Sequence, residues 1–170
     1  MPTPTFEIVK THTVPSNTTN VSLTSISSSY THLYITTNIK NTSGGAGMDY
    51  YMTFNGDTSA NYAVTKAGFA PGGGKGSNRT NAASSMQLFY TVAGSSNNGW
   101  TVGHIWVPFY KNTTFTKNIH VRGTEPLAET GMSTGFWNST SAINRIDISA
   151  SSASSIGAGS TINIYGILKG

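Results

Sequence analysis

The acidic side chains of the chain are few and dispersed. Each Asp stands at the end of an apolar alternating run or in a turn, where Asp ordinarily accepts backbone hydrogen bonds. Glu125 and Glu129 flank Pro126 and are not placed to act as a paired acid and base. Catalysis near neutral pH gathers titratable groups together, and the chain has no Cys. We therefore expect no catalytic residue and no enzyme activity. The six carboxylates are Glu7, Asp49, Asp57, Glu125, Glu129 and Asp147.

The histidines offer one conceivable metal site. His104 and His120 fall in two runs that resemble neighbouring strands, whereas His12 and His32 lie elsewhere. None has a His, Asp or Glu at a ligand spacing beside it, and half-buried strand histidines are the commoner explanation. We expect neither a metal nor a cofactor.

The glycine-rich run from Pro71 to Ser77 resembles a phosphate-binding loop only superficially. A P-loop requires Gly-Lys-Ser/Thr before a helix, but Gly76 follows Lys75 and no helical pattern comes after it. We interpret residues 68–83 as a long loop that is either flexible or ordered by a partner.

The ten Lys and Arg residues are scattered, with a net charge of +4. This scatter disfavours nucleic-acid binding, which needs basic and aromatic residues on one face. Lys66, Lys75 and Arg79 cluster around the glycine-rich run, which indicates either added solubility or docking onto an acidic protein surface. Trp100 and Trp137 adjoin turns and are typical of sugar-stacking or, more commonly, core residues. These five residues are our candidate interaction residues.

The elements that position these residues are strands. Of 170 residues, 22 are Ser, 25 Thr and 15 Asn, types that disfavour helix interiors and suit turns and strand faces. Leu33, Ile35 and Ile39 alternate with polar residues, and the run from Trp100 to Phe109 is apolar on both faces. Nine or ten such short runs between turn signals predict an all-β sandwich or barrel.

One domain is expected for a chain of this length. We predict an extended N-terminal arm over residues 1–5, because it contains Pro2 and Pro4, followed by one β-sandwich domain over residues 6–170. The sequence shows no signal-peptide pattern and no apolar run that would span a membrane. With no Cys, these features predict a protein made in a reducing cytoplasm.

Three segments together resemble a recurring type of tailed-bacteriophage virion surface protein. They are Phe54–Tyr62 (FNGDTSANY), Trp137–Ile143 (WNSTSAI) and Gly159–Ile167 (GSTINIYGI), and Tyr30, Leu33 and Ile35 match the opening Tyr-x-x-Leu-x-Ile strand. Leu168 before Lys169 departs from the usual Tyr-Gly-Ile-Lys ending. The resemblance runs from about Tyr30 to Lys169. It implies a jelly-roll-like antiparallel β-sandwich displayed on the virion, often as a homotrimer. In that fold we expect Gly166 to allow a β-bulge.

Two functions follow from this resemblance. The first is a capsid decoration, or cement, protein that binds across major capsid subunits on the head exterior. The second is a tail-fibre tip that recognises host surface glycans through Trp100, Trp137, Tyr50 or Tyr51. We favour decoration, because the chain has no long triple-stranded shaft of the kind that precedes a fibre tip. A secreted lectin would need the signal peptide that is not seen.

Overall fold

The computed structural model of the chain describes residues 5–42, 48–69, 75–90, 99–125, 129–151 and 156–168. These residues form twelve strands and contain no helix, which confirms the predicted all-β class. The strands are β1 (Phe6–Thr13), β2 (Asn20–Leu23), β3 (His32–Lys40), β4 (Asp49–Phe54), β5 (Tyr62–Phe69), β6 (Lys75–Ala83), β7 (Met86–Tyr90), β8 (Trp100–Val107), β9 (Lys117–Glu125), β10 (Glu129–Trp137), β11 (Ile146–Ala150) and β12 (Thr161–Ile167).

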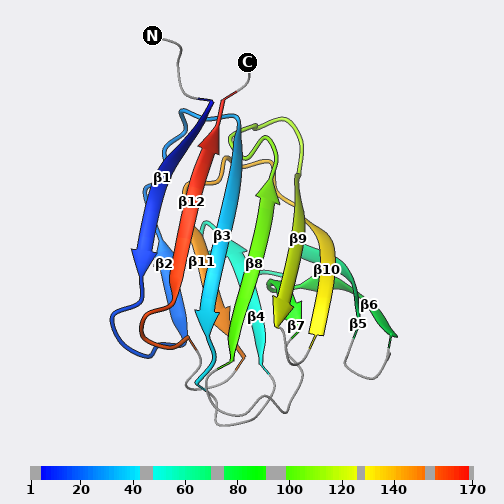
Figure 1. The fold of residues 1–170 in the computed structure, drawn as a ribbon. Coiled ribbons are helices and arrows are strands. Elements are labelled where there is room, and N and C mark those ends of the chain that lie inside the picture. The colour runs from blue at the N-terminus through cyan, green and yellow to red at the C-terminus, as the bar shows by residue number, and fades with distance from the viewer. Residues whose placement is uncertain are drawn as a thin grey trace.

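The strands form two antiparallel sheets that face each other (Figure 1). The larger sheet has the order β1-β12-β3-β8-β9-β10-β5-β6, and the smaller has the order β2-β11-β4-β7. The chain changes sheet at every step from β1 to β5 and from β6 to β8, and again on entering and on leaving β11. The eight strands β1, β12, β3, β8 and β2, β11, β4, β7 form the two facing four-stranded layers of a jelly roll, as predicted.

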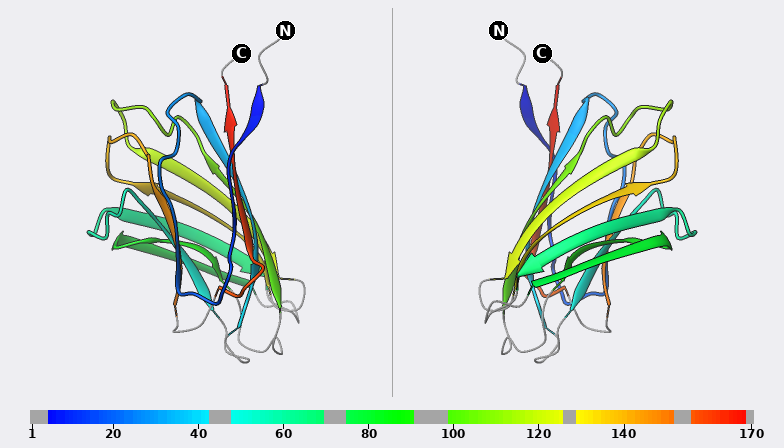
Figure 2. Two further views of the ribbon diagram at one scale, coloured as in Figure 1. Left: turned by 90° about the vertical axis from the view of Figure 1, so that its left-hand side faces the viewer. Right: turned by 90° about the vertical axis from the view of Figure 1, so that its right-hand side faces the viewer.

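Two hairpins are inserted into this jelly roll and extend its larger sheet. One consists of β5 and β6, between β4 and β7; the other consists of β9 and β10, between β8 and β11. Figure 2 shows the larger sheet twisting strongly, so that β5 and β6 run at a steep angle to β1 and β12. Most of the residues that line the two pockets of this sheet belong to these inserted strands.

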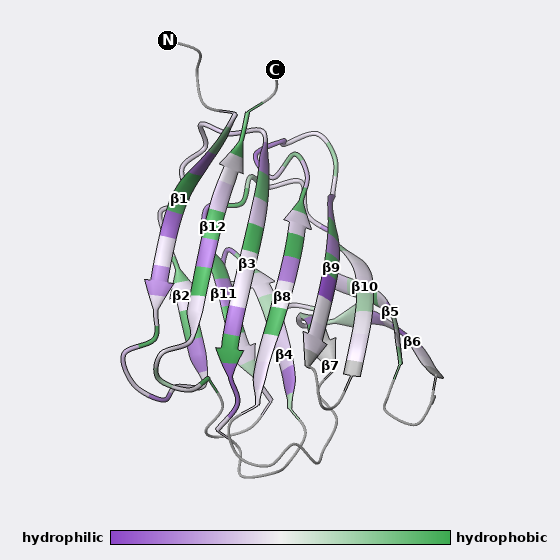
Figure 3. Cartoon of the chain, viewed as in Figure 1, coloured by the Kyte–Doolittle hydropathy of each residue, from purple (hydrophilic) through white to green (hydrophobic). Residues whose placement is uncertain are grey.

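The core fills the space between the two sheets. Along β3, buried Leu33, Ile35 and Ile39 alternate with less buried residues, as the period of a strand requires. The same alternation appears as bands of hydrophobic and hydrophilic colour along β3, β8 and β12 (Figure 3). Aromatic side chains complete the core, and among the largest are Tyr50, Phe54, Tyr62, Tyr110 and Trp137. No part of the described chain forms a long apolar helix of the kind that crosses a membrane.

Two local predictions are wrong. The loop expected over residues 68–83 is largely a hairpin, because β5 runs to Phe69 and β6 begins at Lys75; residues 70–74 lie outside the described residues, as does most of the predicted arm, residues 1–4. No bulge occurs at Gly166. The register of β12 with β3 is continuous, and the irregularity lies on β1, between Ile8 and Lys10.

Candidate functional site

Two of the three motif segments meet at Asp57, in the turn after β4. The carboxylate of Asp57 accepts hydrogen bonds from Trp137 Nε1 at 2.7 Å, Asn61 Nδ2 at 2.9 Å and the backbone N–H of Ser59 at 2.9 Å. These bonds, that from Asn61 above all, lower the pKa of Asp57. Tyr62 donates its hydroxyl hydrogen to the backbone carbonyl of Asp57, and burial raises the pKa of Tyr62 to about 12. Asp57 therefore joins the inserted hairpins to the jelly roll.

Asn55 and Arg145 extend this joint toward the smaller sheet. Asn55 donates to the carbonyl of Ala142, and its side-chain oxygen accepts from the backbone N–H groups of Asn144 and Arg145. The guanidinium of Arg145 donates to both oxygens of Asp147, with its Nη2 2.8 Å from Oδ1. The positive φ of Asn55 and Gly56 is the left-handed geometry expected for an Asn-Gly turn.

The closing motif segment, Gly159–Ile167, packs against the opening Tyr-x-x-Leu-x-Ile motif. Tyr30 lies flat on Gly166, where a Cβ would come within 2.2 Å of the ring. The Tyr30 hydroxyl donates to Glu7 Oε2 at 2.6 Å, and this hydrogen bond raises the pKa of Tyr30. The closing strand therefore needs a glycine here for ring packing rather than for a bulge. All three motif segments thus have structural contacts that hold the fold together.

Two of the four aromatic residues expected for glycan binding are buried. Trp137 is 2% exposed and Tyr50 is fully buried, so both belong to the core and neither is available to a surface partner. Trp100 is 40% exposed and stays a candidate contact. Tyr51 is partly buried, and its hydroxyl donates to Asp49.

The basic residues predicted to cluster lie on opposite faces of the β5–β6 hairpin. Lys66 pairs with Asn78 and lies on the side that faces the smaller sheet, where its Nζ donates to Gln87 Oε1 at 2.5 Å. Arg79 pairs with Thr65, on the other side, and is exposed. The side chain of Lys75 lies outside what the structure describes. The register of the hairpin therefore places Lys66 and Arg79 on opposite faces of the sheet, so they do not form one basic cluster.

The larger sheet exposes an apolar outer surface. We call the side of this sheet that points away from the smaller sheet the outward face. Every large hydrophobic side chain that is exposed among the described residues lies on this face or at its rim. They are Phe6, Ile8, Phe69, Trp100, Val102, Met132 and Phe136 on the strands, and Phe109 and Phe115 in the turn after β8.

Aromatic rings order the β1-β12-β3-β8 half of this face. Phe6 stacks on Tyr165 with ring centroids 4.8 Å apart, and His32 stacks on Trp106 at 5.0 Å. The Tyr34 hydroxyl lies 2.7 Å from His104 Nδ1. Burial lowers the pKa of His32, so this ring is held in its neutral, stacking form.

A shallow groove of about 450 Å³ crosses the other half of the face, over β8, β9, β10 and β5. Phe69, Val102 and Met132 supply its apolar walls, and His104 and Arg122 supply its polar groups. Charge on the face has one sign. Lys40, Arg79 and Arg122 occupy outward positions, and no carboxylate does so among the side chains that the structure describes.

The histidine pair considered for a metal does lie on neighbouring strands of this face, because His120 pairs with Trp106, two residues from His104. His120 Nδ1 lies 3.3 Å from the hydroxyl oxygen of Thr134. His104 Nδ1 lies closer to its own neighbour, the hydroxyl oxygen of Tyr34. Within the described ranges no group of three or more His, Cys, Asp or Glu side chains is arranged to hold a metal ion.

No family model matches the chain, and no curated protein matches it. Among solved structures, scytalido-glutamic peptidase is similar at 15% identity and a TM-score of 0.31, with 91% of this chain and 66% of the peptidase chain covered. The CBM2 module of the evolved Dit of Lactobacillus casei BL23 phage J-1 is 11% identical, with 89% and 69% covered and a TM-score of 0.35. CBM40 of the Ruminococcus gnavus IT-sialidase, bound to α2,6-sialyllactose, is 9% identical, with 95% of both chains covered and a TM-score of 0.35. Likenesses this weak carry no conclusion about function.

The outward face was not predicted as a site. Its signal was present in the run from Trp100 to Phe109, which is apolar at both alternating positions although one side of a sandwich sheet is normally polar. The run is predicted as a strand that is apolar on both faces, without a prediction of which layer covers each face. In the structure, the second apolar row faces outward.

Proposed function

We propose that this protein is a non-enzymatic component of a bacteriophage virion, a capsid decoration protein that binds across major capsid subunits through its outward face. The observation that carries the proposal is the placement of the exposed large hydrophobic side chains, which gather on this one sheet face and its rim. Single exposed apolar residues are normal on a soluble protein, but a contiguous group marks an interaction surface.

The charge of the face specifies the chemistry of the partner. Arg122, Arg79 and Lys40 surround the apolar positions, and the described outward side chains include no carboxylate to neutralise them. A surface of this kind favours an apolar partner with acidic residues at its edge, because opposite charge speeds association and fixes the register. The capsid surface that we propose as partner therefore carries Asp or Glu around an apolar patch.

The alternative function, a fibre tip that recognises host glycans through turn aromatics, loses support because Trp137 and Tyr50 are core residues. Assembly as a homotrimer stays part of the proposal, since three copies would match a quasi-threefold position on a capsid. Native mass spectrometry of the purified protein tests the trimer directly: a monomer at micromolar concentration would contradict it.

The proposed location is tested by counting copies on purified particles. We expect hundreds of copies, all on the head, and a lower temperature of DNA release after the protein is stripped off. A few copies confined to the tail, or unchanged DNA release from stripped heads, would contradict a decoration role.

A further inference from the structure

A row of glycines crosses five neighbouring strands on the side of the larger sheet that faces the smaller sheet. Gly103 pairs with Gly123, Gly123 with Gly131, Gly131 with Gly68, and Gly68 with Gly76. Glycine weakens a strand, and in a strand interior it often marks a place where another group approaches the backbone closely. Packing explains Gly131, where a Cβ would lie 3.1 Å from the carbonyl oxygen of Ala67. Packing does not explain Gly76, where a Cβ would meet nothing within 4 Å.

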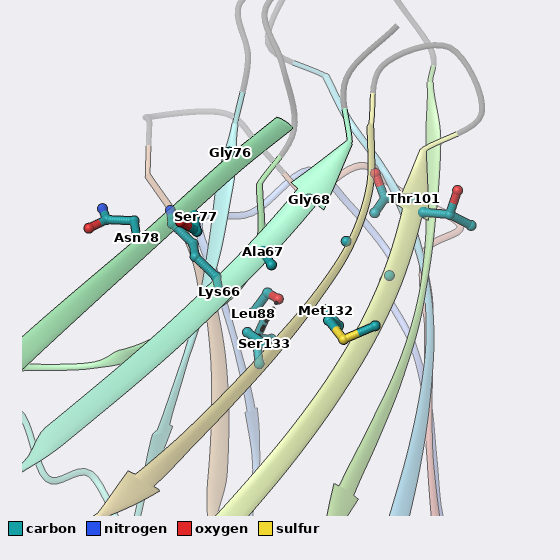
Figure 4. Close-up of a pocket in the computed structure, with 13 residues that line it drawn as sticks. Lys66, Ala67, Gly68, Gly76, Ser77, Asn78, Leu88, Thr101, Met132 and Ser133 are labelled. Carbon is teal, nitrogen blue, oxygen red and sulfur yellow. Dashed lines mark hydrogen bonds between the residues drawn. The ribbon is translucent and has the colours of Figure 1, made fainter. Parts of the chain in front are cut away.

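A pocket of about 310 Å³ lies over this row (Figure 4). Four of the glycines form its floor, and Leu88 of β7 adds an apolar wall. Asn78, which is exposed, lines the pocket from the edge strand β6, on the same side of the hairpin as Lys66. Ser77 pairs with Ala67, so its side chain lies on the outward face. The volume is at the lower end of the range for small-molecule sites.

A buried hydroxyl group without a hydrogen bond lines the pocket. Thr101 is 2% exposed, and its Oγ1 has no partner among the described residues. In Figure 4 Thr101 lies across the pocket from Asn78 and Lys66. A hydroxyl that is buried without a hydrogen bond destabilises the fold, because it has lost its bonds to water. A bound ligand that pairs with this hydroxyl would recover that lost stability.

The lining also holds further polar groups. The Ser133 hydroxyl, in a residue only 5% exposed, donates to the Leu88 carbonyl across 3.3 Å. Lys66 is held on the wall by its bond to Gln87, which in turn donates to Asp49 Oδ1. Among the described residues that line the pocket there is no carboxylate. The lining is therefore a bare apolar floor with hydroxyl, amide and ammonium groups around it.

We propose that this pocket binds a single pyranose-sized sugar ring. A pyranose has flat C–H faces that match a floor without side chains, and a rim of hydroxyls that match polar groups spread around the walls. The Thr101 hydroxyl is the buried contact, and the side chain of Asn78 is the contact at the edge strand β6. The pocket and the outward groove lie on opposite sides of the same strands, and Ala67, Gly123, Thr124, Gly131 and Met132 line both. The sugar proposal rests on the groups of the inward side and does not depend on the capsid proposal.

Two matched threonine variants test the site. Thr101→Val and Thr37→Val each remove a buried hydroxyl without a partner, but only Thr101 lines the pocket. Both variants should keep or raise the melting temperature, because each removes an unpaired polar group. We expect titration of the full chain with glucose, galactose, N-acetylglucosamine and glucuronic acid, followed by NMR, to show saturable binding of at least one sugar. Thr101→Val should weaken it about tenfold, the value of one hydrogen bond, and Thr37→Val should not change it.

A third variant closes the pocket without touching any hydroxyl. Gly76→Leu places a side chain where a Cβ meets open space, so the variant should fold with an unchanged melting temperature and lose sugar binding. Absence of saturable binding by the wild type to all four sugars would overturn the proposal. Binding that survives in both Thr101→Val and Gly76→Leu would also overturn it, because the sugar would then occupy another place.

Discussion

At the residue scale, side chains of the motifs stabilise the fold through hydrogen bonds and ring packing. The carboxylate of Asp57 accepts three hydrogen bonds, one of them from Trp137 in strand β10 of an inserted hairpin. The ring of Tyr30 covers Gly166 of the closing strand β12. The contacts of Trp137 with Asp57 and of Tyr30 with Gly166 join segments that are far apart in the sequence. These contacts explain by the fold much of the motifs that produce the resemblance to phage proteins.

The contact of Trp137 with Asp57 gives a stability prediction. Trp137→Phe keeps an aromatic ring in the core but removes the N–H that the carboxylate accepts, so we expect a loss of about 1.5–3 kcal/mol in the free energy of unfolding near pH 7. The folded-state pKa of Asp57 lies below 3.8, so its stabilising effect is present above pH 3.8 and is lost as the pH falls through the lowered pKa.

Urea unfolding of the wild type and of Trp137→Phe, at neutral and at acidic pH, measures this difference in the free energy of unfolding. The difference between them should shrink on acidification. A variant as stable as the wild type at neutral pH would show that the hydrogen bond contributes nothing.

At the scale of elements, alternation made most strands predictable and failed where a strand lacks a buried side. The run from Leu33 to Ile39 shows its period because one side enters the core. β6, with the sequence KGSNRTNAA, lies at the edge of the sheet, and its described side chains are almost all exposed, so nothing in its composition distinguishes it from a loop. The glycine row could not be predicted either, because it depends on how five strands pair in register.

Gly135 of β10 marks where an inserted hairpin packs most closely on its neighbours. A Cβ there would come 2.5 Å from the carbonyl oxygen of Ala63 and 3.2 Å from Met86 Sδ. Because the first contact is with backbone, Gly135→Ala must shift β5 and should cost about 1–3 kcal/mol. Gly76→Ala is the matched control, since its Cβ meets open space and should leave stability equal or slightly higher. Thermal unfolding measures both, at roughly 2–4 °C per kcal/mol. Equal melting temperatures would contradict this account of β10.

At the scale of the whole molecule, the jelly roll and the inserted hairpins have different roles. The jelly roll supplies a rigid core, and the inserted hairpins widen one sheet into a broad surface whose outward side is apolar and basic. The all-β class and the sandwich followed from a composition rich in Ser, Thr and Asn and from the strand period. The outward direction of the second apolar row could not be predicted. The sequence alone cannot show whether a row such as Val102 and Trp106 meets a covering layer or solvent.

The central claim is that the outward face attaches the protein to capsids, and placing a negative charge on this face tests it most directly. The measurement is the binding of purified Arg122→Glu and Met132→Glu proteins to phage heads stripped of the protein. Thr19→Glu serves as the control, because Thr19 is exposed and precedes β2 in the opposite sheet. Both positions on the outward face are exposed, so all three variants should keep the wild-type melting temperature. We expect the two outward-face variants to lose at least tenfold in affinity and Thr19→Glu to bind as the wild type does. Wild-type binding by both outward-face variants, or an equal loss in Thr19→Glu, would contradict the claim.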